Sequence, residues 1–288
     1  MRYGVPMSSD RGWTQVGDGV FQRRYPPLDL SVGVVLGPAG ATVVDTGGTL
    51  GEAGAILRDV SEAFQLPVVA AINTHAHYDH VFGNQVFAAL GIPVYGHHRI
   101  PAHFAAHEGP RLAAVLADPL REPDKEWDGV ELTPPSVLIR SALEVDLGGR
   151  ALELIPIDPG HTDTDLAVLI PDCRTWFLGD VIEESGPPMF GSGSYPLAWP
   201  AALRSLMREM RAGDTIVPGH GAAVDRDFVD RQEQRLRAVA DEIRRRYAPG
   251  LASDEVDVPD SLLDQWPERF LRSAFREGFA HLDEGSEA

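Results

Sequence analysis

Four apolar segments of this chain each end in a turn that carries histidine or aspartate, and this arrangement strongly constrains the fold. The first segment, "VVAAIN" (68–73), runs into the turn "THAHYDH". The segments "LELIPI", "TWFL" and "TIV" each run into a turn with one further candidate. The side chains concerned are His75, His77, Asp79, His80, His161, Asp180 and His220. Because ligands at strand ends can converge on one edge of a sheet core, we expect them to form one site.

These residue types indicate a metal centre. Neutral imidazole and carboxylate groups are good ligands for Zn²⁺ and for other borderline divalent ions. Seven ligands are too many for one tetrahedral ion, whereas two ions about 3.5–4 Å apart would use them, with one carboxylate bridging. Cys173 is the single cysteine, which excludes an all-cysteine zinc site. The alternative is that these side chains only cap helices and satisfy hydrogen bonds.

The motifs "HAHYDH", "PGHTDTD", "FLGD" and "VPGHG", in this order, resemble those of the metallo-β-lactamase superfamily. The resemblance extends from about residue 19 to residue 225. It implies an α/β (α+β) fold, a four-layer αββα sandwich with two metal ions in the cleft between the sheets. It also implies the ligands: His75, His77 and His161 for the first ion, Asp79, His80 and His220 for the second, and Asp180 as the bridge. The bridging aspartate is similar to that of the glyoxalase II branch, whereas true β-lactamases of this fold lack it.

The secondary-structure pattern agrees with a mixed α/β class. Strand-like segments lie at residues 19–25, 30–37, 41–47, 68–73, 92–96, 137–147, 150–157, 165–171, 175–179 and 215–219. Thr49 and Glu52 have the spacing of a capping box, so a helix is expected to begin there. Further helices are expected over residues 84–90, from about Pro200, and over residues 225–247.

We see no clear boundary in the sequence, so residues 1–288 are expected to form one domain. Residues 97–136 contain Ala-rich helical pieces broken by prolines, which indicates an inserted helical flap. Residues 248–288 are expected to be a partly helical C-terminal extension. His103 and His107 share a helix face in the flap, but no carboxylate clearly completes a metal site there, so a solvated or pocket-rim role is favoured.

Charge and composition exclude several classes of protein. The formal net charge is −18 and Lys125 is the single lysine, so no basic patch for nucleic acid is expected. No apolar run of about 18 residues suggests a membrane span, and no secretory signal is visible. With one cysteine, the chain is expected to be a cytoplasmic protein. The sequence does not indicate an oligomeric state.

The expected chemistry is hydrolysis of a thioester, ester, lactone or lactam through a hydroxide that bridges two Zn²⁺ ions, two per chain, with Fe or Mn as alternatives. Asp79 is the candidate to orient the attacking water. Metal-bound histidines usually donate their second N–H to an acceptor. Asp45, Thr162 and Asp163 are the candidate acceptors.

The substrate is expected to be a small acyl molecule. The segment "SGPPMFGSGSYPLAW" (185–199) follows Asp180 directly. Its larger side chains, Met189, Phe190, Tyr195 and Trp199, either line an apolar acyl pocket or pack the loop onto the following helix. One alternative function is a mononuclear iron enzyme that oxidises a persulfide and uses the same first-ion ligands. Another is a β-lactamase-like lactam hydrolase. Metal analysis separates iron at one per chain from zinc at two.

Overall fold

The computed structural model describes residues 12–286 and contains two β-sheets. The first sheet has seven strands in chain order: β1 (Thr14–Gly17), β2 (Val20–Tyr25), β3 (Leu30–Gly37), β4 (Gly40–Val44), β5 (Val68–Ile72), β6 (Val94–His97) and β7 (Val137–Ile139). Strands β1 to β4 are antiparallel, and β4 to β7 are parallel. The pattern did not predict β1, a short and largely exposed edge strand. It also gave residues 137–147 as one strand-like segment, which the structure divides into β7 and a strand of the second sheet, Leu143–Leu147.

The second sheet has five strands in the order β12-β11-β10-β9-β8. Their bounds are β8 (Leu143–Leu147), β9 (Arg150–Pro156), β10 (Leu166–Ile170), β11 (Thr175–Phe177) and β12 (Thr215–Val217). Strands β11 and β12 are parallel, and the other neighbours are antiparallel. A core of aliphatic side chains from both sheets, including Val35, Ile72, Leu154 and Val168, fills the space between them.

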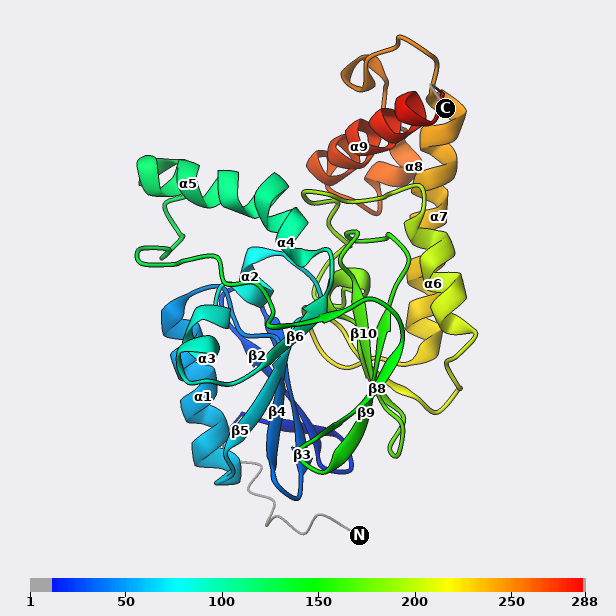
Figure 1. The fold of residues 1–288 in the computed structure, drawn as a ribbon. Coiled ribbons are helices and arrows are strands. Elements are labelled where there is room, and N and C mark those ends of the chain that lie inside the picture. The colour runs from blue at the N-terminus through cyan, green and yellow to red at the C-terminus, as the bar shows by residue number, and fades with distance from the viewer. Residues whose placement is uncertain (1–11, 287–288) are drawn as a thin grey trace.

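Helices cover the outer face of each sheet, which gives the layer order helix, sheet, sheet, helix (Figure 1). Strand β3 is buried along its whole length because its side chains alternate between two layers. Val34 faces the helices that cover the first sheet, and Val35 faces the second sheet. This period of two is what a strand between two layers requires. The four-layer αββα architecture expected from the motifs is therefore confirmed.

Helix α1 (Leu50–Phe64) covers the first sheet together with α3 (Asn84–Ala89). Its N-cap is Thr49, whose side chain accepts a hydrogen bond from the Glu52 N–H at 3.0 Å, as the capping-box spacing predicted. The Glu52 carboxylate accepts from the Gly48 N–H at 2.7 Å. A Ser or Thr N-cap contributes about 1 kcal/mol to stability.

Helices α6 (Trp199–Met207) and α7 (Arg226–Arg246) cover the second sheet. Helix α6 begins beside Pro200, as expected. The predicted inward stripe of α7 is fully buried: Val229, Leu236, Val239 and Ile243.

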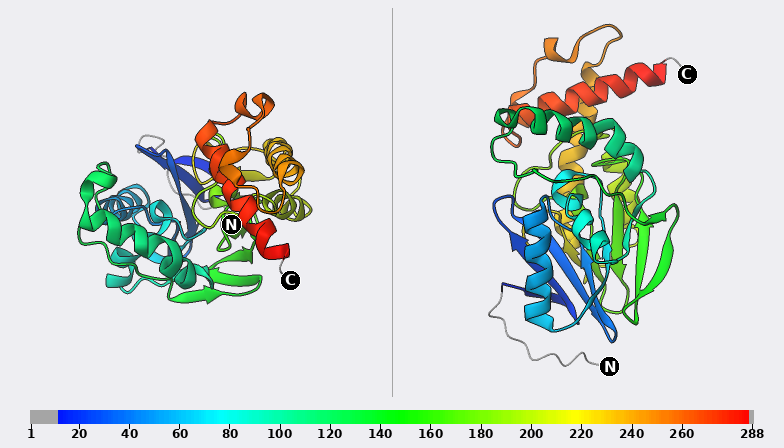
Figure 2. Two further views of the ribbon diagram at one scale, coloured as in Figure 1. Left: turned by 90° about the horizontal axis from the view of Figure 1, so that it is seen from above. Right: turned by 60° about the vertical axis from the view of Figure 1, so that its left-hand side comes forward.

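Two helical regions lie at the same end of the sandwich (Figures 1 and 2). Between β6 and β7 the chain forms α4 (Ile100–His103), a π-helix (Phe104–Glu108), α5 (Gly109–Ala117) and a 3₁₀ turn (Pro119–Arg121), with no strand, as the sequence indicated. After α7 come a 3₁₀ turn (Ser253–Glu255), α8 (Asp260–Leu263) and α9 (Glu268–Ser286). Within residues 12–286, none of the helices has the length and apolar character needed to cross a membrane.

Candidate metal centre

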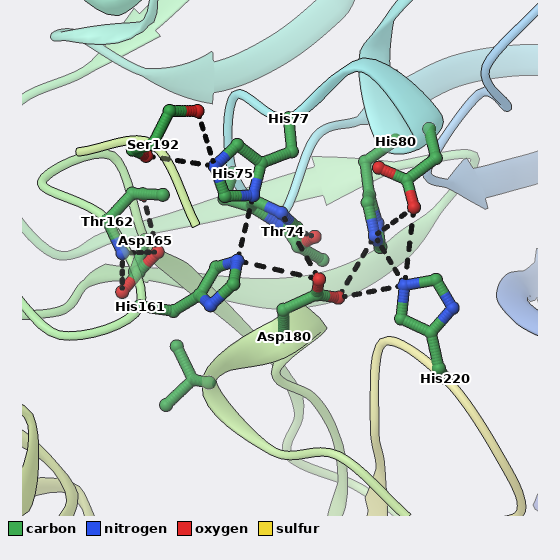
Figure 3. Close-up of polar contacts among 12 residues, drawn as sticks. Thr74, His75, His77, His80, His161, Thr162, Asp165, Asp180, Ser192 and His220 are labelled. Atoms are coloured by element: carbon green, nitrogen blue, oxygen red, sulfur yellow. Dashed lines mark hydrogen bonds and ion pairs between the residues drawn. The ribbon is translucent and has the colours of Figure 1, made fainter. Parts of the chain in front are cut away.

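The predicted ligands lie at one edge of the two sheets. The chain leaves β5 and forms the short helix α2 (Tyr78–Val81), which carries Asp79 and His80. Strands β11 and β12 are parallel, so the turns after them lie at the same edge. These turns carry Asp180, within a 3₁₀ turn (Gly179–Val181), and His220. His161 comes from the loop between β9 and β10. Figure 3 shows six of these side chains pointing toward one another: His75, His77, His80, His161, Asp180 and His220.

The first group of ligand atoms consists of three imidazole nitrogens and a carboxylate oxygen. His161 Nε2 lies 2.8 Å from His77 Nδ1 and 3.5 Å from Asp180 Oδ2. His75 Nε2 lies 3.7 Å from the same carboxylate oxygen. Four ligand atoms thus lie within 4.8 Å of one another, a spacing that one divalent ion could span.

The second group lies on the other side of Asp180. His220 Nε2 lies 3.4 Å from both Asp79 Oδ2 and His80 Nε2. The other carboxylate oxygen of the shared aspartate, Asp180 Oδ1, lies 3.0 Å from His80 Nε2 and 3.4 Å from His220 Nε2. Asp180 therefore presents one oxygen to each group, which is the geometry of a bridging carboxylate.

Four of the five histidines place their second ring nitrogen beside an acceptor. His80 Nδ1 lies 2.8 Å from Asp45 Oδ2, His77 Nε2 lies 3.0 Å from the Ser192 carbonyl, and His220 Nδ1 lies 2.9 Å from the Leu28 carbonyl. His75 Nδ1 lies 3.2 Å from the Thr74 hydroxyl. Such partners select the tautomer and the ring orientation of a metal ligand. The structure thus places one predicted acceptor, Asp45, as expected.

The other two predicted acceptors have different contacts. Thr162 donates its N–H and its hydroxyl to the carboxylate of Asp165, and Asp163 pairs with Arg99 and His103. Neither residue therefore accepts a hydrogen bond from a predicted ligand histidine, contrary to expectation. Asp165, which the sequence reasoning missed, holds the 161–165 loop. Burial raises the pKa of Asp165 to about 8.

The two groups of histidines have opposite electrostatics. Burial and the neighbouring imidazoles hold the pKa values of His75 and His77 well below normal, and burial lowers that of His161 to about 4. Burial also opposes the charging of His80 and His220. There, however, the nearby carboxylates, above all Asp180, outweigh it and raise both pKa values.

The carboxylates remain ionised. Burial opposes ionisation of Asp79, but the charges of His80 and His220 outweigh it and lower the pKa of Asp79 to about 2. The same balance holds the pKa of Asp180 well below normal.

The residues fit a pair of divalent cations. His75 Nε2 is buried and has no hydrogen-bond partner, and the neighbours of Asp180 Oδ1 are the ring nitrogens of His80 and His220. An unsatisfied buried polar atom costs about 1–3 kcal/mol, a cost that a bound cation would offset. The backbone also fits the site closely: a side chain at Gly219 would place its Cβ 1.9 Å from Asp180 Oδ1, so the Pro-Gly-His turn needs its glycine.

A cavity of about 260 Å³ opens beside the second group. Asp79, Asp180 and His220 contribute to its floor, and Leu28, Met189 and Phe270 add apolar walls. Arg111, from α5, also lines it. The helical region between β6 and β7 and the C-terminal region thus each supply one wall.

The four predicted substrate-binding residues have different surroundings. Met189 lines the cavity and is 47% exposed. Phe190 and Trp199 are buried and pack against each other, with ring centroids 5.6 Å apart. Tyr195 stacks on His281. The lining of this cavity includes Met189 alone among the four, and Phe190 and Trp199 instead pack the loop onto α6. No local sequence pattern predicted that the cavity would also be lined by Leu28, Arg111 and Phe270.

His103 departs from the solvated or pocket-rim role expected for the two flap histidines, whereas His107 is half-buried. His103 is buried, and its side chain lies with His77 and Glu108 in a group whose ligand atoms are within 4.8 Å of one another. The sequence alone indicates no carboxylate for this position. Glu108 supplies one because a π-helix, rather than a regular α-helix, runs through Phe104–Glu108.

Comparison with known proteins agrees with this fold. The family model of the metallo-beta-lactamase superfamily matches residues 25–235. A linear primary-alkylsulfatase from Pseudomonas sp. (strain ATCC 19151) is 24% identical over 278 residues, which is 83% of this chain. The chain spans about half of that protein, 51% of its length.

A metallo-beta-lactamase type 2 from Bacillus sp. (strain 170) is 24% identical over 220 residues, 75% of this chain and 76% of that protein. The solved structure of a metallo-beta-lactamase from Pontibacter korlensis superposes with a TM-score of 0.63 at 19% identity, and covers 78% of this chain and 98% of that one. The chain belongs to the metallo-beta-lactamase superfamily.

Proposed function

We propose that this protein is a dinuclear zinc hydrolase that cleaves a carbonyl-centred bond of a small organic substrate. The observation that carries the proposal is the position of Asp180, whose two oxygens face two separate groups of ligand atoms. His75, His77 and His161 would hold one ion. Asp79, His80 and His220 would hold the other. When bound, two such ions lower the pKa of water and polarise a carbonyl oxygen.

The protein's own groups prepare this chemistry. Asp79 stays ionised because its pKa is about 2, so its carboxylate accepts hydrogen bonds at neutral pH and can orient a water molecule. His80 is held by Asp45 and His220 by the Leu28 carbonyl, so these rings keep their orientation when a substrate enters. This rigid placement lowers the entropic part of the activation barrier.

The cavity supports a small acyl substrate. Its volume, about 260 Å³, lies near the lower end of the range for small-molecule sites. Its apolar walls would exclude water from the acyl group. A second, complete group of ligands favours the dinuclear hydrolase over a mononuclear iron oxidase, which would need only His75, His77 and His161.

The test is a hydrolysis panel of thioesters, lactones, aryl esters and β-lactams, run with zinc-loaded protein. Sulfate esters belong in the panel because of the alkylsulfatase relative. We expect turnover of at least one carbonyl substrate, its loss with a chelator and its return with Zn²⁺. The matched variant Asp180→Ala should lose at least about 10²-fold in activity. Turnover that survives complete removal of metal would contradict the proposal.

A further inference from the structure

A carboxylate beyond the seven predicted ligands lies beside the second group. Glu183 is 6% exposed and lines the cavity. One of its oxygens lies within 4.8 Å of ligand atoms of both Asp180 and His220. Among the described residues, nothing donates a hydrogen bond to its carboxylate or forms an ion pair with it. The Glu183 carboxyl group thus faces the cavity without a protein partner, at a position that a ligand can reach.

The backbone holds Glu183 firmly in this place. Its N–H donates to Gln232 Oε1 at 3.0 Å, and Gln232 Nε2 donates to the Val181 carbonyl at 2.8 Å. Gln232 is buried on α7. The rigid helix therefore clamps the segment that leads from Asp180 to Glu183.

The next residue ties the same segment to His220. The Glu184 N–H donates to the His220 carbonyl at 3.0 Å, and the Glu184 carboxylate accepts from the Ala222 N–H at 2.8 Å. The neighbouring carboxylates thus have different surroundings. Glu184 is satisfied by the backbone, whereas Glu183 is directed at the second group.

We propose that Glu183 is an additional ligand of the second ion. The inference rests on the proposed dinuclear centre and adds to it. With Glu183, the second ion would have two imidazoles and up to three carboxylates, since Asp79 and Asp180 already face it. Carboxylate ligands and higher coordination numbers suit Mn²⁺ better than tetrahedral Zn²⁺. The second site is therefore expected to bind Mn²⁺ more tightly than a site without Glu183 would.

The test measures metal binding rather than activity. Mn²⁺ affinity of the second site is measured by titration calorimetry on protein whose first site is filled with one equivalent of Zn²⁺, for wild type, Glu183→Gln and Glu184→Gln. Loss of a partner that only holds a metal ligand typically weakens metal binding by about 10- to 100-fold. Loss of a ligand itself should weaken it at least as much, so we expect a loss of at least about 10-fold in Glu183→Gln. Glu184→Gln is the matched control, because it removes the same charge one residue away and keeps an acceptor for Ala222. Its affinity should stay within about twofold of wild type.

Two further measurements keep the test decisive. Glu183→Asp retains the charge but shortens the side chain, so a ligand role predicts weakened binding in this variant too, whereas wild-type affinity in it would reject ligation. A crystal structure with Mn²⁺ should show a Glu183 oxygen about 2.0–2.6 Å from the second ion. Two ions bound with wild-type affinity in Glu183→Gln would overturn this inference and leave the dinuclear proposal intact. Failure of wild type to bind a second ion would overturn both.

Discussion

His80 and Asp45 form the shortest contact between the candidate metal centre and its surroundings, with Nδ1 and Oδ2 2.8 Å apart. Asp45 also accepts hydrogen bonds from the N–H and the hydroxyl of Thr74. Its backbone has a φ of 65°, in the left-handed region that non-glycine residues seldom occupy. Such strained residues concentrate at functional sites. Asp45 therefore positions His80 and the start of the ligand loop together.

Replacing Asp45 with Asn should weaken binding of the second ion by about 10- to 100-fold, because an anionic acceptor raises the basicity of the histidine it holds. Competition with a chromophoric chelator measures the affinity. Asp59→Asn is the control, since Asp59 accepts from the Tyr25 hydroxyl far from the ligands and should leave metal affinity unchanged. Equal loss in both variants would show that the effect is general instability.

Metal binding at the second site should release protons. The carboxylates around His80 and His220 raise both pKa values, so these histidines hold protons at neutral pH in the metal-free protein. An ion must displace those protons, and its apparent affinity should therefore rise with pH. Calorimetry in buffers of different ionisation enthalpy counts the protons. More than one proton per second ion is expected at pH 7, and none would refute the assignment.

The five histidines of the candidate metal centre should make their largest contribution to the stability of the metal-free protein near pH 6.5. Below that pH, the unfolded chain protonates His75, His77 and His161 while the folded protein resists, so stability falls as pH falls. Above it, the unfolded chain releases protons that the folded protein keeps on His80 and His220, so stability falls as pH rises. Each histidine contributes at most about 1.4 kcal/mol per pH unit. Urea unfolding from pH 5 to 9 tests this, and His220→Ala should flatten the alkaline side.

Truncation of the cavity wall should affect substrate binding rather than the chemical step. Met189→Ala removes apolar surface worth about 1–2 kcal/mol, so KM for a substrate with an apolar acyl group should rise about 5- to 30-fold with little change in kcat. Tyr195→Phe serves as the comparison, because Tyr195 stacks on His281 and does not line the cavity. An equal change in both variants would argue against this cavity as the acyl site.

The fold and the ligand turns were predictable from local sequence. The alternating pattern of Val34 and Val35 identifies a strand between two layers, and the capping-box residues Thr49 and Glu52 identify the start of a helix. Each predicted ligand directly follows an apolar strand, so the local signal and the tertiary placement coincide.

The cavity was less predictable, because its walls come from distant parts of the chain. Leu28, Arg111 and Phe270 meet at the site only through the packing of the helical regions on the sheets. Phe190 and Trp199 have the apolar character of residues that line a pocket, yet both are buried in the core beneath α6. No local sequence pattern pointed to Glu183, because its position beside Asp180 and His220 is recognised only in three dimensions.

The metal content of the protein at saturation tests the central claim most directly. Protein dialysed against Zn²⁺ and then freed of excess metal should contain two ions per chain by elemental analysis, and His75→Ala and His220→Ala should each contain about one. A wild-type content of one ion, unchanged by His220→Ala, would contradict the dinuclear centre.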